Sequence, residues 1–392
     1  MHPPVYLDHA ATTPVRPEVL EAMLPYLGST SFGNPSSAHR FGRAARAGLE
    51  QARREVATAI GGGVEPAQVV FTSGGTEADN LAIIGAALAA RHSGRPMRVA
   101  VSAIEHKAVL AAAHQVKALG GDEVTIPVGA DGQIDLDALD RVLADAPAVI
   151  SVMWVNNETG VRQPIPEIAA RCHRSGVLLH SDAVQAFGKL PLSIKDLPVA
   201  LLTISGHKIG APKGIGALIV RDRKAVEAII HGGSQQFGLR PGTENVAGAV
   251  GLGRAASLAA EERPVEAERL QALQDRLAGR LREVVPHLVI HGEGSRAPHI
   301  LSLGIPGTDG EALLMHLDLA GVAVSTGSAC STGAVEPSHV LTAMGVPRAL
   351  ALGSIRVSLG HQSTEGDVDR LAEVLPEVVA RVRKLSVVLG RA

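Results

Sequence analysis

A single cysteine, Cys330, lies in the segment STGSACSTG at residues 325–333, among Ser, Thr, Gly and Ala. A cysteine that packs in a core behaves as a small hydrophobic residue, and this segment offers it few apolar neighbours. A thiol in an accessible loop is exposed to oxidation, which favours a chemical role for it. A loop cysteine can also be incidental, so the segment alone leaves both interpretations open.

Asp182 and Lys208 each follow an apolar run that is typical of a strand. A carboxylate at the end of a buried strand is unfavourable without a partner. It could cap a following helix or pair with a cationic ring nitrogen. A lysine in a desolvated place has a lowered pKa and can act as an amine nucleophile. Lys213 is the alternative lysine, but its Pro and Gly neighbours indicate a turn, so we favour Lys208.

The segment TSGGTEADN at residues 72–80 is a glycine-rich turn between a strand-like run and a helix-like run. Free N–H groups and the dipole at a helix N-terminus favour an anion, most often phosphate. Glycines also close such turns for steric reasons, so a purely structural role stays open. The segment lacks the patterns of nicotinamide and nucleoside triphosphate sites. A phosphate cradle, a carboxylate for a ring nitrogen and a Schiff-base lysine are the parts that a pyridoxal phosphate site requires.

The elements that must position these residues are strand-like runs that alternate with Ala- and Leu-rich helical segments from about residue 66 to 222. This alternation predicts an α/β fold with a mostly parallel sheet covered on both faces. Ligands of such sheets bind beyond the carboxyl ends of the strands. The residues that follow the strand-like runs include Gly75, Thr76, Glu105, His106, Asn156, Asn157, Asp182, Gln185, Ser205, His207 and Lys208. We therefore expect them to converge on one rim.

The chain of 392 residues exceeds a usual single core and predicts two domains. We assign residues 14–258 to a large cofactor-binding domain, and residues 1–13 with 259–392 to a smaller α+β domain that carries Cys330. A long helical region near 244–285, interrupted at Pro264, would join the two.

Composition excludes several classes of function. A net charge of −2 gives no electrostatic signature of nucleic-acid binding. We identify neither a signal peptide nor an apolar run of about 18 residues that could cross a membrane, and we expect a cytoplasmic protein. The second cysteine, Cys172, falls on the apolar face of a helical pattern, which predicts a core position. Two distant cysteines indicate neither a disulfide framework nor a zinc site.

Ten segments, taken in order from residue 6 to about 360, resemble the cysteine desulfurases. This is the NifS/IscS-like branch of the class-V aminotransferases, within the fold-type I pyridoxal phosphate enzymes. The segments are YLDHAATTP, NPSSAHRFG, TSGGTEADNLAI, IEHKAV, VNNETG, HSDAVQAFGK, SGHKIGAPKGIGAL, RPGTEN, STGSACSTG and IRVSLG. The resemblance implies the aspartate aminotransferase-like fold, pyridoxal phosphate as cofactor and L-cysteine as substrate. The sequence EPSHVLTAMG after the cysteine segment is similar to the group with an extended Cys loop.

The resemblance also implies a role for each matching residue. Lys208 would bind the cofactor covalently and move the substrate's Cα proton, with assistance from His106. Asp182 would keep the ring nitrogen protonated, and Arg356 would hold the substrate carboxylate in a fork. Asn157 and Asn34 would help to orient the substrate. The full set implied to bind the cofactor is Lys208, Gly75, Thr76, His106, Asn157, Asp182, Gln185, Ser205, His207 and Thr243 of the partner subunit.

Cys330 would be the nucleophile that takes the substrate's sulfur as a persulfide, leaving L-alanine. A homodimer is implied, as is an acceptor of the sulfur such as an iron–sulfur scaffold protein or a thiolation partner. No metal site is expected beyond a transient [2Fe–2S] cluster shared through Cys330. A selenocysteine lyase, another β-eliminating lyase and a non-catalytic sulfur-relay or scaffold subunit remain alternatives. Phe237 and Ala211 depart from the residues that relatives commonly carry.

Overall fold

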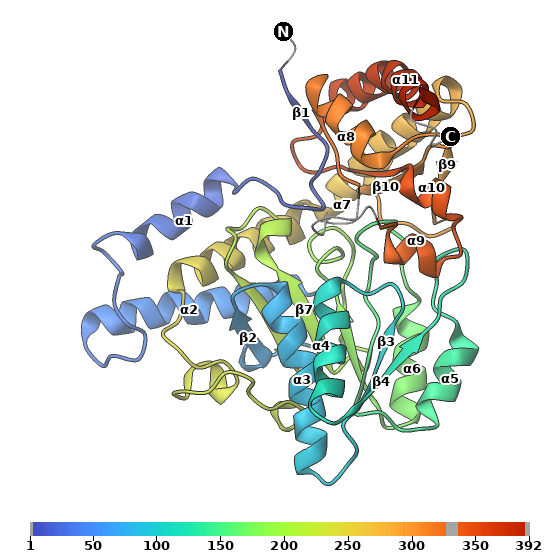
Figure 1. Cartoon of the computed structure of the whole chain (residues 1–392). Coiled ribbons are helices and arrows are strands. Elements are labelled where there is room, and N and C mark those ends of the chain that lie inside the picture. The colour runs from blue at the N-terminus through green and yellow to red at the C-terminus, as the bar shows by residue number, and fades with distance from the viewer. Residues whose placement is uncertain (1–2, 293, 327–335, 389–392) are drawn as a thin grey trace.

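The structure is a computed structural model that describes residues 3–292, 294–326 and 336–388. A seven-stranded sheet lies at its centre, with the strand order β2-β8-β7-β6-β5-β3-β4 (Figure 1). The strands are β2 (Val69–Thr72), β3 (Arg98–Ser102), β4 (Asp122–Ile126), β5 (Val149–Ser151), β6 (Leu178–Asp182), β7 (Leu201–Ser205) and β8 (Gly216–Val220). Neighbouring strands are parallel except where β8 pairs with β2 and β7. The predicted α/β fold with a mostly parallel sheet is confirmed.

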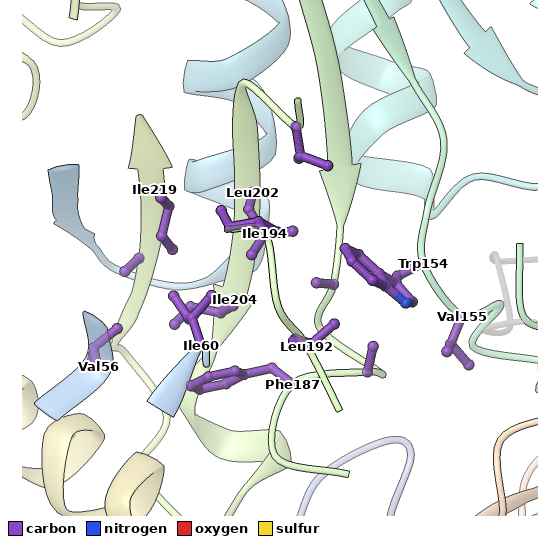
Figure 2. Packing of buried hydrophobic residues seen from close by; sticks show 14 of the residues in the cluster. Val56, Ile60, Trp154, Val155, Phe187, Leu192, Ile194, Leu202, Ile204 and Ile219 are labelled. Atoms are coloured by element: carbon purple, nitrogen blue, oxygen red, sulfur yellow. The ribbon is translucent and has the colours of Figure 1, made fainter. Parts of the chain in front are cut away.

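Helices cover both faces of this sheet, as near-continuous apolar strands require. One layer contains α3 (Gly75–His92) and α4 (Lys107–Ala118), which pack on β-strand side chains such as Val99, Val101 and Leu201. The other layer contains α2 (Arg40–Ala59), α5 (Leu136–Leu143), α6 (Ile165–Arg174) and the first part of α7 (Val246–Val284). Figure 2 shows this second core, where Val56 lies near Ile204 and Ile219 of the sheet.

Cys172 lies in the second layer, on α6, and is fully buried. Burial raises the pKa of its thiol to about 12, so the group stays protonated at neutral pH. The predicted core position of Cys172 is confirmed.

The helix α7 runs for 39 residues with Pro264 inside it. The predicted interruption at Pro264 is therefore wrong. A proline in a helix interior costs about 3 kcal/mol. The two parts of α7 pack in different cores, with Leu252 in the large one and Leu273, Leu277 and Leu281 in the small one. Burial on both sides of Pro264 offsets the local penalty.

The smaller unit has its own core, built on a three-stranded sheet of order β12-β10-β9 and on the pair β1-β11. Its elements are β1 (Val5–Tyr6), β9 (Val289–Ile290), β10 (Ile300–Gly304), α8 (Gly310–Leu319), β11 (Val322–Ala323), β12 (Ser354–Ser358) and α11 (Glu365–Val388). Two short helices, α9 (His339–Ala343) and α10 (Arg348–Leu352), pack against Ile104 of the large unit. The remaining helix, α1 (Pro17–Leu27), lies beside α7. The exact domain boundaries stay a prediction.

Within the described part of the chain, no helix is both long enough and apolar enough to cross a membrane.

Candidate active site

Most of the predicted rim residues line one cavity of about 310 Å³, whereas Glu105 and Asn156 are fully buried and do not line it. It lies where β6, β7 and the N-terminus of α3 meet, and β12 of the smaller unit supplies Arg356. The predicted site residues that line it are Gly75, Thr76, His106, Asn157, Asp182, Gln185, Ser205, His207, Lys208 and Arg356. The strand-end rule thus brought together residues from five separate segments, whereas Arg356 was expected only from the family resemblance.

Lys208 ends a short 3₁₀ turn, η2 (Gly206–Lys208), directly after β7. Its Nζ donates hydrogen bonds to the carbonyl oxygens of Ala10 and Ala11, each at 2.6 Å. Burial, and then the positive charge of Arg356, lower the pKa of Lys208 to about 8. A fraction of this amine is therefore unprotonated at neutral pH, as a nucleophile or a general base requires.

Asp182 is the last residue of β6 and is 5% exposed. Its Oδ1 accepts a hydrogen bond of 2.9 Å from the backbone N–H of Val184. Burial raises the pKa of Asp182, while the nearby His106 and Lys208 lower it. The segment that follows is a series of turns, so Asp182 does not cap a helix. A buried carboxylate that faces a cavity is suited to bind a cationic ring nitrogen.

The helix α3 begins at this cavity with an open N-terminus. Its first residue is Gly75, and no side chain caps it. A Cβ atom added at Gly75 would come within 3.1 Å of a Val184 methyl group and 3.6 Å of the Ser205 Cβ, so the backbone lies close to β7 and to the turn after β6. Uncapped N–H groups beside the Thr76 and Ser205 hydroxyls form a cradle for a phosphate group. This arrangement fits the predicted cofactor.

Two histidines in their neutral forms also line the cavity. His106 precedes α4, and its Nδ1 accepts a hydrogen bond of 3.2 Å from the N–H of Ala108. Burial lowers the pKa of His106, although Asp182 opposes this effect. Its remaining proton is therefore held on Nε2. His207 contacts the Thr12 hydroxyl at 3.1 Å, and burial lowers its pKa to about 4.

Arg356, on β12, is 5% exposed and has two partners. Its Nη2 donates to Asp8 Oδ1 and its Nη1 to the carbonyl oxygen of Asn157, both at 2.8 Å. Its Nε is buried without a hydrogen-bond partner within the described residues. The guanidinium group thus faces the cavity while Asp8 holds it in place. Asp8 was not among the predicted site residues, although it lies within the segment YLDHAATTP.

Gln185 follows β6 and lines the cavity beside these groups. Its Nε2 donates a hydrogen bond of 3.0 Å to the carbonyl oxygen of Ala10. Since Lys208 binds the same oxygen, the segment near Ala10 links Gln185 and Lys208.

Three predicted site residues are not part of this cavity. Asn34 is exposed, and its side chain accepts a hydrogen bond from the N–H of Ser36. Thr243 lies in an exposed turn before α7. Cys330 lies outside the described residues. The roles of all three stay predictions.

Asp79 and His180 were not identified from the sequence. Asp79 lines the cavity, and His180 is fully buried. The alternation of side chains along β6 was an available signal, because His180 must share the face of Asp182.

Comparisons with known proteins agree with this geometry. The family description Aminotransferase class-V matches residues 5–371. The chain is 44% identical over 383 residues to a protein named cysteine desulfurase IscS from Dictyoglomus turgidum, covering 97% of this chain and 96% of the relative. It is 43% identical over 384 residues to a cysteine desulfurase from Gluconacetobacter diazotrophicus, covering 97% and 95%. Among solved structures, a NifS-like protein superposes with a TM-score of 0.89 at 34% identity, covering 96% of this chain and all of that one.

Proposed function

This chain belongs to the class-V aminotransferase family and is a cysteine desulfurase that uses pyridoxal phosphate, and we propose that Lys208, Asp182 and the N-terminus of α3 form its reaction centre. One observation carries the proposal. An amine with a pKa of about 8, a buried carboxylate and an uncapped helix N-terminus all face one cavity of about 310 Å³.

Each part of the cofactor has a matching group in this cavity. Lys208 would bind its aldehyde carbon, Asp182 its ring nitrogen and Gln185 its ring oxygen. Thr76, Ser205, His207 and the N–H groups of α3 would hold its phosphate. When bound, pyridoxal phosphate supplies an electron sink for the charge that develops on the substrate's Cα.

The residues of the chain then perform the proton transfers. Lys208 removes a proton from the Cα of L-cysteine, and its lowered pKa provides the free amine for this step at neutral pH. His106 holds a proton on Nε2 beside the same cavity and can donate it. Arg356 orients the substrate by binding its carboxylate, with the guanidinium held in place by Asp8.

Cys330 is the proposed acceptor of the sulfur. The Cβ–S bond of L-cysteine breaks, an S–S bond forms to the Cys330 sulfur, and a proton is added at Cβ to give L-alanine. The described residues on both sides of the Cys330 segment support this role. Ser325 pairs with Arg356 through two backbone hydrogen bonds, and the Ser338 hydroxyl binds the carboxylate of Glu158. Cys330 is five residues from Ser325, and five residues of extended chain span about 17 Å.

The proposal includes a homodimer that completes each site with Thr243 of the partner subunit. On the described surface, Leu20, Leu24 and Leu27 of α1 and the nearby Phe32 are each at least half exposed. Apolar surface of this kind is typical of an interface, and a second copy of the chain is its proposed occupant.

The persulfide would pass its sulfur to an iron–sulfur scaffold protein or to a thiolation partner in the cytoplasm. The identity of this acceptor and a transient [2Fe–2S] cluster at Cys330 stay predictions.

The test measures alanine and sulfide formation from L-cysteine and a reductant, comparing the wild type with Cys330→Ala. Cys172→Ala is the matched control, because Cys172 is a buried core thiol. We expect equal amounts of both products from the wild type and from Cys172→Ala, and neither product from Cys330→Ala. Continued alanine formation by Cys330→Ala would show that Cys330 is not the acceptor and would favour direct elimination of sulfur.

A further inference from the structure

A group of buried polar residues lies beneath the cavity, and of these only Asp182 has a part in the proposed reaction. We call it the floor; it consists of Asp79, Glu105, Ser151, His180, Asp182 and Thr203. All of these residues are 5% exposed or less. They lie on the side of the sheet that α3 and α4 cover, where the surrounding side chains are apolar.

Asp79 lines the cavity and lies close to Asp182. It lies on α3, four residues after Gly75, and is 1% exposed. Ligand atoms of Asp79, Asp182 and His106 lie within 4.8 Å of one another. Asp79 Oδ1 is buried and has no hydrogen-bond partner among the described residues.

The rest of the floor connects by hydrogen bonds. His180 Nδ1 contacts the Ser151 hydroxyl at 2.8 Å, and its Nε2 contacts the Thr203 hydroxyl at 3.0 Å. The Ser151 hydroxyl donates to Glu105 Oε2 at 3.2 Å. His180 Nε2 is 3.7 Å from Asp79 Oδ1. Burial lowers the pKa of His180 to about 3, so this histidine is neutral and adds no positive charge beside Asp79.

Two carboxylates this close in a dry environment repel each other, so that only one of them ionises readily. The charged and titratable groups that face the pair decide which one. Val184 donates an N–H to Asp182, and the positive charge of Lys208 favours the ionised form of Asp182. Burial and then the charges of Asp182 and Glu105 raise the pKa of Asp79 well above its usual value, and only Thr203 opposes them. The proton therefore belongs on Asp79.

We propose that Asp79 is a positioning residue that carries a proton at neutral pH, leaves the negative charge on Asp182, and so presents a single negative charge to the cofactor's ring nitrogen. The part that concerns the ring nitrogen rests on the proposed function. The protonation state of Asp79 is a property of the chain itself and can be measured separately.

The first experiment is infrared spectroscopy of the full chain at pH 7, with and without pyridoxal phosphate. We expect carbonyl bands of protonated carboxyl groups in the wild type, because Glu105 is also partly protonated at this pH. One of these bands should be lost in Asp79→Asn and retained in Glu105→Gln. Labelling the wild type with carboxyl-¹³C aspartate should shift the same band, which tests the assignment without any substitution. A wild type with only ionised aspartate bands would overturn the proposal.

The second experiment measures the affinity for pyridoxal phosphate by absorbance titration. Asparagine has the shape of a protonated aspartate and no charge, so we expect Asp79→Asn to bind within about twofold of the wild type. A loss of tenfold or more would overturn the proposal, because it would show that Asp79 contributes a charge. Asp182→Asn is the control and should lose at least about tenfold. An unchanged affinity in Asp182→Asn would contradict the proposed cofactor site, whatever the infrared result for Asp79.

Discussion

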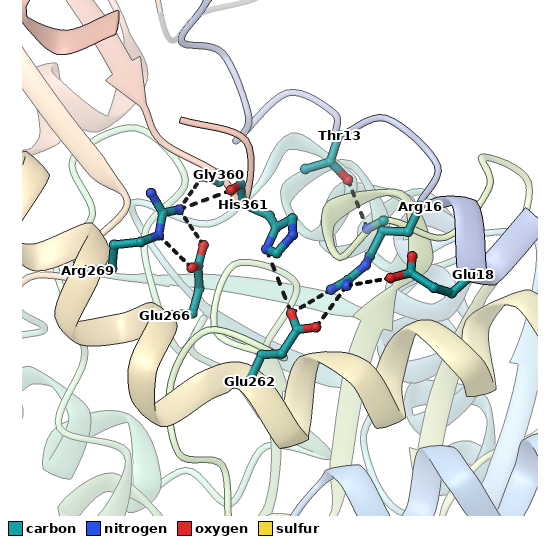
Figure 3. A network of polar contacts seen from close by, with 9 residues as sticks. Thr13, Arg16, Glu18, Glu262, Glu266, Arg269, Gly360 and His361 are labelled. Atoms are coloured by element: carbon teal, nitrogen blue, oxygen red, sulfur yellow. Dashed lines mark hydrogen bonds and ion pairs between the residues drawn. The ribbon is translucent and has the colours of Figure 1, made fainter. Parts of the chain in front are cut away.

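Two polar regions of this molecule use similar residue types in opposite surroundings. The floor of the cavity is buried beneath apolar side chains. The second region is a surface clasp formed by Arg16, Glu18, Glu262, Glu266, Arg269 and His361 (Figure 3). In the clasp, both Nη atoms of Arg16 bind the Glu262 carboxylate, at 2.6 and 2.8 Å, and Glu18 is a further partner.

The clasp connects the two units of the chain. Arg269 on α7 binds Glu266 through two hydrogen bonds, and its guanidinium also donates to the carbonyl oxygens of Gly360, His361 and Ser363. Every charge here has an opposite charge beside it, and the side chain of Glu262 is 36% exposed. In the floor, burial disfavours the ionised form of a carboxyl group, and the pKa values of Asp79 and Glu105 are therefore raised. The degree of burial, rather than the residue type, decides whether a carboxyl group is ionised and paired with a cation or stays protonated near neutral pH.

The largest effect is expected at the cavity itself. Lys208→Ala removes both the amine that binds the cofactor and the base for the Cα proton. Alanine formation should fall by at least about 10³-fold, and the absorption band of lysine-bound cofactor should disappear. Lys213→Ala is the matched control, because Lys213 is exposed five residues further on and should retain most activity. Comparable losses in the two variants would show that the assignment of Lys208 is wrong.

Glu105 in the floor should also make the free energy of unfolding depend on pH. Burial raises the pKa of Glu105 to about 7, whereas the unfolded chain releases this proton near 4.5. Between these two values the folded state binds more protons, so this group stabilises the fold below pH 4.5 and loses that contribution as pH rises to 7. The difference of about 2.5 pKa units corresponds to about 3 kcal/mol.

Glu105→Gln cannot titrate and should therefore lack this contribution. We expect the free energy of unfolding of the wild type, measured with urea, to fall relative to Glu105→Gln between pH 4.5 and pH 7. Glu268→Gln, at an exposed position on α7, is the control and should parallel the wild type. Parallel curves for the wild type and Glu105→Gln would mean that folding does not raise the pKa of Glu105.

The sequence predicted the rim better than the floor, for a physical reason. Parallel strands bring their carboxyl ends to one edge of the sheet. Asp182, Ser205 and Lys208 could therefore be placed together, because each lies at or just after the end of a strand. The proximity of Asp79 to Asp182 depends on the rotation of α3 about its axis over β6, which no local pattern determines. The proposed proton on Asp79 depends in turn on that proximity.

Backbone conformation also limited what the sequence could predict. Gln236 and Phe237 both have positive φ values, of 47° and 61°, which is uncommon for such residues. The Phe237 ring lies between the guanidinium groups of Arg53 and Arg223, with distances of 5.0 and 4.8 Å to the ring centroid. The buried Gln236 amide oxygen accepts a hydrogen bond of 2.9 Å from the N–H of Phe71. These tertiary contacts offset the local strain, and they account for an aromatic residue at position 237.

An intermediate effect is expected at Arg356, which is buried like the floor and paired like the clasp. Arg356→Lys keeps a positive charge but cannot bind Asp8, the Asn157 carbonyl and a substrate carboxylate with a planar fork. KM for L-cysteine should rise about tenfold, with a smaller change in kcat, because the lost contact holds the substrate before and during the reaction. Steady-state alanine formation measures both constants. An unchanged KM would exclude Arg356 as the carboxylate-binding residue.

The smallest effect is expected in the clasp. The pair of Arg16 and Glu262 has good two-pronged geometry, but Glu262 is 36% exposed, and exposed ion pairs contribute at most about 1 kcal/mol. A double-mutant cycle of Arg16→Gln and Glu262→Gln, followed by urea unfolding, should give a coupling free energy in this range. High salt should reduce it, because mobile ions screen exposed charges. A coupling of several kcal/mol that persists in high salt would mean that the clasp is as dry as the floor, and the contrast between the two regions would fail.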